Sequence, residues 1–193
     1  YDFFRREDGL IYFNLADVSG KGMNAALLMA KVSSLLRHLG RDISDPGELL
    51  ARVNDEVCET VSHGMFVTLV SGLLDPASRT VRLANAGHQP PLYHRGGGDF
   101  EELPATAPPL GVLGGLEFPV TRLELGAGSL YIFTDGVTES TNEAGEELRV
   151  SGLKRLIRAR SAISCSERLA RLVEEICRPD VVQHDDITFL LIE

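Results

Sequence analysis

The sequence lacks several features that would point directly to a function class. Its three cysteines, Cys58, Cys165 and Cys177, are odd in number and form no CxxC pair. They therefore predict neither a disulfide framework nor a zinc cluster, and a reducing compartment fits, so we expect a cytoplasmic protein. No stretch approaches the roughly 20 apolar residues of a membrane span, and no segment has the pattern of a signal peptide.

Basic residues are also scarce. The chain has 19 Lys and Arg residues against 28 Asp and Glu residues, which gives a net charge of −9. Nucleic-acid backbones and anionic membrane surfaces are bound by clustered positive charge. We therefore expect neither nucleic acid nor membrane among the partners.

The length and composition fit one soluble globular domain. The 193 residues are 44% hydrophobic and 24% charged, which is close to the average of such proteins. The chain has no initiator Met and begins within an apparent strand at Tyr1. We expect a single domain over residues 1–193 that lacks its first strand or strands and is the C-terminal effector part of a longer protein.

The hydrophobic pattern predicts an α+β fold. Two apolar runs flank Asp8-Gly9, which is a strong hairpin signal. From Met65 the apolar period changes to two, which predicts a series of antiparallel strands, and a last strand ends the chain. Helical spacing occurs in four segments: residues 25–39, 45–61, 150–160 and 167–177. We expect two antiparallel sheets flanked by helices, a four-layer α–β–β–α sandwich.

The stretch LADVSGKGMNAALLMA, residues 15–30, predicts a strand that ends at Asp17, a glycine-rich turn and a helix. Residues 20–25 match GxGxxA, the dinucleotide-binding fingerprint, which also requires a second parallel strand after the helix. Here the helix leads to another helix through Asp45-Pro46, so that interpretation fails, and no Walker loop is present. Asp17 remains either a helix cap or a metal ligand.

The stretch LYIFTDGVTES, residues 130–140, takes a hydrophobic strand into Asp135-Gly136. It superficially resembles the haloacid-dehalogenase phosphatases, in which a nucleophilic aspartate lies two residues before a second aspartate. Phe133 occupies that position here, so a covalent mechanism has no nucleophile. Asp135 belongs either to a simple turn or to a site at the end of the strand.

Two more carboxylates, Asp185 and Asp186, precede the last strand in HDDITFLLIE. Adjacent strand residues point to opposite faces, so we expect at most one of them to face a given site. Carboxylates gathered from distant strands repel one another unless a cation neutralises them, and oxygen ligands without His or Cys select Mg²⁺ or Mn²⁺. The strand-end acids together predict a metal site, although each alone also fits a purely structural role.

Five stretches in order resemble blocks of the bacterial SpoIIE/RsbU-type branch of the metal-dependent serine/threonine protein phosphatases (PPM class). They are ADVSGKGMNAALLMA, FVTLVSGLLDPASRTVRLANAGHQPPLY, PPLGVL, IFTDGVTES and DDITFLLI. The resemblance implies an α–β–β–α sandwich with a cluster of two Mn²⁺ or Mg²⁺ ions. It also implies that a water bridging the two ions attacks a phosphoserine or phosphothreonine.

The resemblance also implies roles for particular residues. Asp17 would bridge both metals, and the backbone carbonyl of Val18 would bind one of them. Asp135 and Asp185 would complete the shell of the other metal, with Asp186 as the less favoured choice. These carboxylates would act in catalysis through the metal-bound water, so that no side-chain nucleophile is needed.

Two departures from the family pattern affect the site. The first strand of the family carries Gly-Gly-Asp-x-Tyr-Asp, so its metal-binding aspartate would lie two residues before Tyr1, and Asp2 is not expected to be a ligand. Lys21 stands where eukaryotic relatives have a histidine. Lys21 and His88 are candidates for substrate binding, and the alternative for His88 is a loop histidine that bonds its own backbone.

The family resemblance finally implies partners. We expect a phosphoprotein substrate, typically a phosphorylated STAS-domain antagonist of an anti-sigma factor, and an upstream sensory or receiver domain. A homodimer is also compatible with this architecture. The alternative to a phosphatase is an interaction module of the same fold with weak or no catalytic activity.

Overall fold

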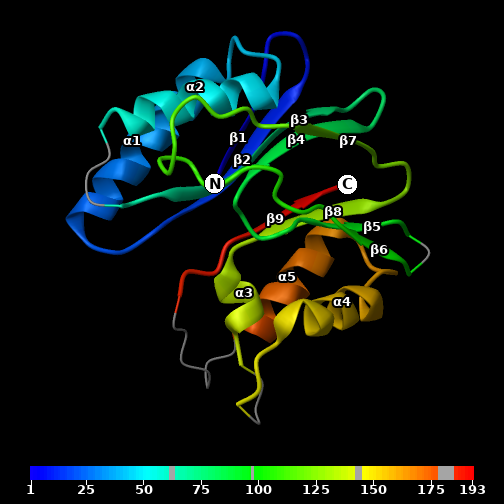
Figure 1. Ribbon diagram of the computed structural model, residues 1–193. Coiled ribbons are helices and arrows are strands. Elements are labelled where there is room, and N and C mark those ends of the chain that lie inside the picture. Colours follow the sequence, from blue (N-terminus) through cyan, green and yellow to red (C-terminus); the bar gives the residue numbers. More distant parts are fainter. Residues whose placement is uncertain (61–63, 97, 142–144, 178–184) are drawn as a thin grey trace. The chain divides into compact units, whose positions relative to one another are not determined.

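Two antiparallel sheets, each with its own helices, make up the structure (Figure 1). The computed structural model describes residues 1–60, 64–96, 98–141, 145–177 and 185–193. The chain divides into two compact units. Unit 1 comprises residues 1–90 and 104–125, and unit 2 comprises residues 91–103 and 126–193. The expectation of one phosphatase domain over the whole chain stays a prediction.

Unit 1 contains a five-stranded sheet in the order β1-β2-β3-β4-β7, with every neighbouring pair antiparallel. Its strands are β1 (Asp2–Arg5), β2 (Ile11–Val18), β3 (Val67–Asp75), β4 (Thr80–Ala86) and β7 (Val120–Glu124). The predicted hairpin at Asp8-Gly9 is confirmed. Gly9 has a φ of 86°, and the Asp8 carboxylate accepts a hydrogen bond from the Leu10 N–H.

Helices α1 (Met23–Leu39) and α2 (Pro46–Cys58) cover one face of this sheet. Their buried residues, among them Val32 and Val53, pack with Tyr12 of β2 and Leu69 of β3. Helix α2 begins as its sequence predicts, because the Asp45 carboxylate accepts a hydrogen bond from the Glu48 N–H at 2.9 Å.

Unit 2 contains a four-stranded antiparallel sheet in the order β6-β5-β8-β9. Its strands are β5 (Leu92–His94), β6 (Phe100–Glu102), β8 (Ser129–Phe133) and β9 (Phe189–Ile192). Its helices are α3 (Asp135–Glu139), α4 (Arg149–Ala159) and α5 (Cys165–Ile176). Leu153, Ile157 and Leu172 of the two longer helices pack against Tyr131 and Phe133 of β8 in one apolar core.

A buried arginine fixes the far end of β9 within unit 2. Arg168 of α5 is 6% exposed. Its Nη1 donates to Ser129 Oγ, to the Tyr131 hydroxyl and to a Glu193 carboxylate oxygen at 2.5 Å. Its other nitrogens donate to backbone carbonyls between α4 and α5. Hydrogen bonds to every nitrogen satisfy the buried charge and join α5 to β8 and β9.

The structure departs from the sequence-based expectations at three places. Asp135 begins the short helix α3, where a turn or strand end was expected. The last strand begins only at Phe189, so Asp185 and Asp186 lie outside it and the alternation of strand side chains does not apply to them. Helix α2 ends at Cys58, short of the expected residue 61, and residues 61–63 lie outside the described residues.

Within the described ranges, none of the helices has the length and apolar character that crossing a membrane would require.

The cap of α2 generates a first prediction. The change Asp45→Ala removes the acceptor of the Glu48 N–H, and loss of such a cap typically costs about 1 kcal/mol of unfolding free energy. For a domain of this size we expect Tm to fall by about 2–4 °C. Thermal unfolding followed by circular dichroism measures the shift. Asp42→Ala, at an exposed aspartate of the same loop, is the matched control, and an equal shift in both variants would contradict the assignment.

Candidate metal centre

Asp17 lies near the end of β2, on the sheet face opposite helices α1 and α2. Its neighbours Ala16 and Val18 pack into the core beneath those helices. Because side chains alternate along a strand, the half-buried Asp17 points to the other face. Strand β2 continues through Asp17 and Val18, which pair with Thr68 and Val67 of β3. The ligand candidates are therefore part of the sheet ladder and not of a free loop.

The residue that follows Val18 closes this end of the sheet. The Ser19 N–H donates to the Phe66 carbonyl at 2.9 Å, and the Phe66 N–H donates to Ser19 Oγ at 2.8 Å. The chain then turns through Gly20 and Gly22, whose φ values of 84° and 87° are unfavourable for other residues. The Ser19 N–H belongs to the same peptide as the Val18 carbonyl, so its hydrogen bond to Phe66 also fixes where that carbonyl lies.

The interpretation of Asp17 as a helix cap is wrong. Helix α1 begins at Met23 with Gly22 at the N-cap position, and no side chain caps it. Five residues separate Asp17 from Met23, and Asp17 is fixed in the strand instead. Lys21 is exposed in the intervening turn, between the two glycines of positive φ.

His88 is buried in the loop after β4, with 4% of its surface exposed. Its backbone is held by Asn85, which accepts from the His88 N–H at 2.8 Å and donates to the His88 carbonyl at 3.2 Å. The imidazole Nδ1 lies 2.8 Å from the hydroxyl of Thr68, the residue directly opposite Asp17. The ring thus contacts a residue of strand β3. Sequence reasoning could not single out Thr68, because its neighbours depend on the strand register.

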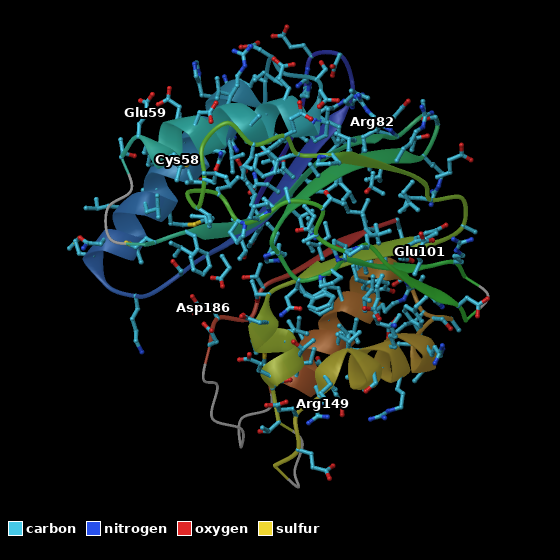
Figure 2. The ribbon with its side chains drawn as sticks, viewed as in Figure 1. Cys58, Glu59, Arg82, Glu101, Arg149 and Asp186 are labelled. Carbon is cyan, nitrogen blue, oxygen red and sulfur yellow. The ribbon has the colours of Figure 1, made fainter. Side chains whose placement is uncertain are left out.

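In unit 2, Asp135 is brought next to the Asp185-Asp186 segment. Thr134 Oγ1 donates to the Asp186 carbonyl at 2.8 Å and accepts from the Thr188 N–H at 3.0 Å. The Thr134 N–H also donates to the Thr188 carbonyl. Figure 2 shows Asp186 beside the start of α3. Two segments about 50 residues apart in sequence are joined here by one threonine.

Gly136 permits this close approach. A Cβ atom at Gly136 would lie 2.6 Å from the Asp186 carbonyl oxygen and 3.3 Å from the Asp185 carbonyl carbon. Real Cβ atoms do not come that close to backbone, so any side chain at this position would push the two segments apart. The glycine following Asp135 is required by crowding, and its φ is not in the left-handed region.

Hydrogen bonds to the backbone orient two of these carboxylates. One Asp135 oxygen accepts from the Gly136 N–H at 2.9 Å, and one Asp185 oxygen accepts from the Asp186 N–H at 2.8 Å. Asp135 is half-buried, whereas Asp185 and Asp186 are exposed. The structure thus brings the backbone of Asp135 next to that of Asp185 and Asp186, and their role as ligands stays a prediction.

The donor atoms of these segments suit a hard divalent cation. Unit 1 offers the Asp17 carboxylate and the Val18 carbonyl, and unit 2 offers the carboxylates of Asp135 and Asp185. All are oxygens, the ligands that Mg²⁺ and Mn²⁺ prefer. Among the residues the structure describes, no three His, Cys, Asp or Glu side chains form a ready-made metal cluster. The close packing at Gly136 and the chemistry of the donors nevertheless fit such a metal.

The chain is similar in sequence to bacterial phosphoserine phosphatases. The sequence model of the family described as stage II sporulation protein E (SpoIIE) matches residues 7–193. Phosphoserine phosphatase RsbU of Bacillus subtilis is 28% identical over 195 residues, which cover all of this chain and 58% of RsbU. Phosphoserine phosphatase RsbP of the same organism is 26% identical over 148 residues, which cover 73% of this chain and 36% of RsbP. The chain thus spans little more than half of RsbU.

Solved structures show the same fold. The RsbU and RsbW domains of Rv1364c from Mycobacterium tuberculosis match with a TM-score of 0.78 at 25% identity, over 98% of this chain and 53% of that one. The PP2C phosphatase domain of SpoIIE from Bacillus subtilis matches with a TM-score of 0.73 at 16% identity, over 94% and 54%. The predicted α+β class, with two antiparallel sheets flanked by helices, is confirmed.

The match to the family covers nearly the whole sequence and includes every segment that carries a candidate ligand: the end of β2, the start of α3 and the segment before β9. On that basis the chain is a member of the stage II sporulation protein E (SpoIIE) family.

Proposed function

We propose that this chain is the catalytic domain of a metal-dependent phosphoserine/phosphothreonine protein phosphatase. The observation that carries the proposal is the contact between Gly136 and the Asp186 carbonyl, which brings Asp135 to the Asp185-Asp186 segment. Acidic side chains carried by adjoining segments repel one another, and a bound cation would neutralise them. The phosphoserine phosphatases RsbU and RsbP are the relatives that support this activity.

The proposed metal ligands of unit 1 are Asp17 and the Val18 carbonyl, and those of unit 2 are Asp135 and Asp185. A bound pair of Mn²⁺ or Mg²⁺ ions would lower the pKa of a water molecule and neutralise the phosphoryl oxygens. The magnesium complex of RsbX, a neighbour with a TM-score of 0.74 at 16% identity, has the same fold. The residues of this chain supply the oxygens and keep them in place.

Asp2 lies opposite Asn14 in the pairing of β1 with β2, and its carboxylate forms an ion pair with Arg37 at 2.6 Å. This ion pair fits the expectation that Asp2 is not a ligand.

The proposed substrate is a phosphoprotein, of which a phosphorylated STAS-domain antagonist of an anti-sigma factor is the leading candidate. Lys21 would attract the phosphate, because its exposed ammonium lies in the turn four residues after Asp17. The rival proposal is an interaction module that keeps the fold without the activity. The two differ in whether adding metal produces turnover.

Hydrolysis of p-nitrophenyl phosphate with and without Mn²⁺ tests the proposal. The assay is run on the full-length protein. We expect turnover that depends on Mn²⁺ and is abolished by EDTA. A folded protein with no metal-dependent turnover would favour the interaction module.

Substitution at Asp17 gives a direct test of the metal assignment. Asp17→Asn keeps the size and hydrogen bonding of the side chain and removes the negative charge. Loss of a residue that only supports a ligand typically costs about 10- to 100-fold in activity, so we expect kcat/KM to fall by at least about 100-fold. Asp75→Asn, at the end of β3 and far from Asp17 in the register, is the control. Activity of Asp17→Asn within a few-fold of the unchanged protein would overturn the assignment.

The two acids before β9 should differ in effect. Asp135→Asn and Asp185→Asn should each reduce activity as Asp17→Asn does, whereas Asp186→Asn should be milder. In Asp186 it is the carbonyl that binds Thr134, and substitution of the side chain leaves that bond intact. Steady-state kinetics at saturating Mn²⁺ decides the order. Greater sensitivity at Asp186 would make Asp186 the ligand.

The close approach at Gly136 can be tested separately. Gly136→Ala places a methyl group 2.6 Å from the Asp186 carbonyl and should separate the two acidic segments. We expect weaker Mn²⁺ binding, measured by isothermal titration calorimetry on the metal-free protein. Gly114→Ala is the matched control, because the nearest atoms to its Cβ lie 3.9 Å away. Unchanged Mn²⁺ affinity in Gly136→Ala would contradict a ligand role for this pair of segments.

A further inference from the structure

Two linked hydrogen bonds, from the loop after β4 and from β3, lead to the backbone carbonyl of Asp17. Thr68 Oγ1 lies 2.8 Å from the Nδ1 of His88 and donates to the Asp17 carbonyl at 3.4 Å. We infer that His88 and Thr68 are positioning residues, which hold the Asp17-Val18 segment in the geometry that metal binding needs. This inference rests on the proposed function and adds a supporting structure behind its ligands.

The tautomer of His88 sets the directions of these hydrogen bonds. A threonine hydroxyl has one proton, and a carbonyl oxygen can only accept. When Nδ1 of His88 carries a proton, Nδ1–H donates to Thr68 and leaves the Thr68 proton for the Asp17 carbonyl. Support of Asp17 by Thr68 therefore requires this tautomer of His88.

The backbone of His88 is also fixed by its neighbours in the loop. Asn85, which is 2% exposed, makes hydrogen bonds to both the N–H and the carbonyl of His88. Gly87 has a φ of 65°, and a Cβ atom there would lie 2.5 Å from the ring of Pro109. These contacts leave the His88 backbone little freedom to move. A buried side chain on such a fixed backbone is better suited to support a ligand than to contact substrate.

The position of the peptide that joins Asp17 to Val18 affects both ligand candidates of unit 1. The orientation of this peptide sets where the Asp17 side chain begins and where the next carbonyl, that of Val18, points. Mg²⁺ and Mn²⁺ hold oxygens at about 2.1 Å in near-octahedral geometry and tolerate little displacement. Ser19 and Phe66 anchor the segment on its C-terminal side, so Thr68 supplies the anchor on the other side.

Substitution of Thr68 tests the inference with a readout that is independent of activity. Thr68→Val keeps the shape of the side chain and removes the hydroxyl, whereas Thr68→Ser keeps the hydroxyl. We expect Thr68→Val to weaken Mn²⁺ binding to the metal-free protein by about 10- to 100-fold, the usual effect of losing such support, and Thr68→Ser to remain near the unchanged protein. Thr80→Val, at the buried threonine that begins β4, is the matched control.

A second pair of variants covers the case in which Thr68→Val fails to fold. The amide nitrogen of His88→Asn can take the place of Nδ1, whereas that of His88→Gln cannot reach the same position. We expect His88→Asn to bind Mn²⁺ more tightly than His88→Gln. Melting temperatures of the metal-free variants, measured in EDTA, separate general loss of stability from loss of positioning.

The outcomes separate failure of the proposed function from failure of this inference. Absence of Mn²⁺ binding in the unchanged protein would overturn the proposed function and this inference with it. Normal Mn²⁺ binding in the unchanged protein and equal affinity in Thr68→Val and His88→Gln would overturn the inference alone. A lowered melting temperature with unchanged affinity would give these residues a purely structural role.

Discussion

Like charges held near one another need a rigid backbone beneath them. In unit 2, Asp135 lies on a segment that packs against Asp185 and Asp186, and acidic side chains gathered on adjoining segments repel one another. Hydrogen bonds of Thr134 and the close packing at Gly136 hold these segments together. In unit 1, Asp17 is fixed in the pairing of β2 with β3. The position of each candidate ligand therefore depends on the backbone that carries it.

Both units meet the constraint in the same way. In unit 1, Thr68 reaches across from β3 to the Asp17 carbonyl, and in unit 2 Thr134 reaches from the end of β8 to the Asp186 carbonyl. In each case a short hydroxyl side chain binds the backbone of an acidic residue on a neighbouring segment. Threonine suits this task because its β-branched side chain is restricted at χ1.

The last strand of unit 2 is fixed at both ends. Thr134 holds Thr188 just before β9, and the buried Arg168 binds Glu193 just after it. Removing Glu193 would leave the charge of the buried Arg168 without its carboxylate partner, which is costly. The Asp185-Asp186 segment therefore precedes a strand that cannot slide along its neighbour β8.

The sequence by itself determined the elements that depend on local pattern. The hairpin at Asp8-Gly9, the cap at Asp45 and the order of strands and helices follow from turn chemistry and apolar spacing, and the acidic strand ends were visible as residues. Only the tertiary structure decided that Asp17 is no helix cap, that Asp135 begins a helix and that Asp185 and Asp186 lie outside β9. Thr68, Gly136 and Arg168 were likewise beyond the sequence, because their partners lie about 25 to 50 residues away and are set by strand register and packing.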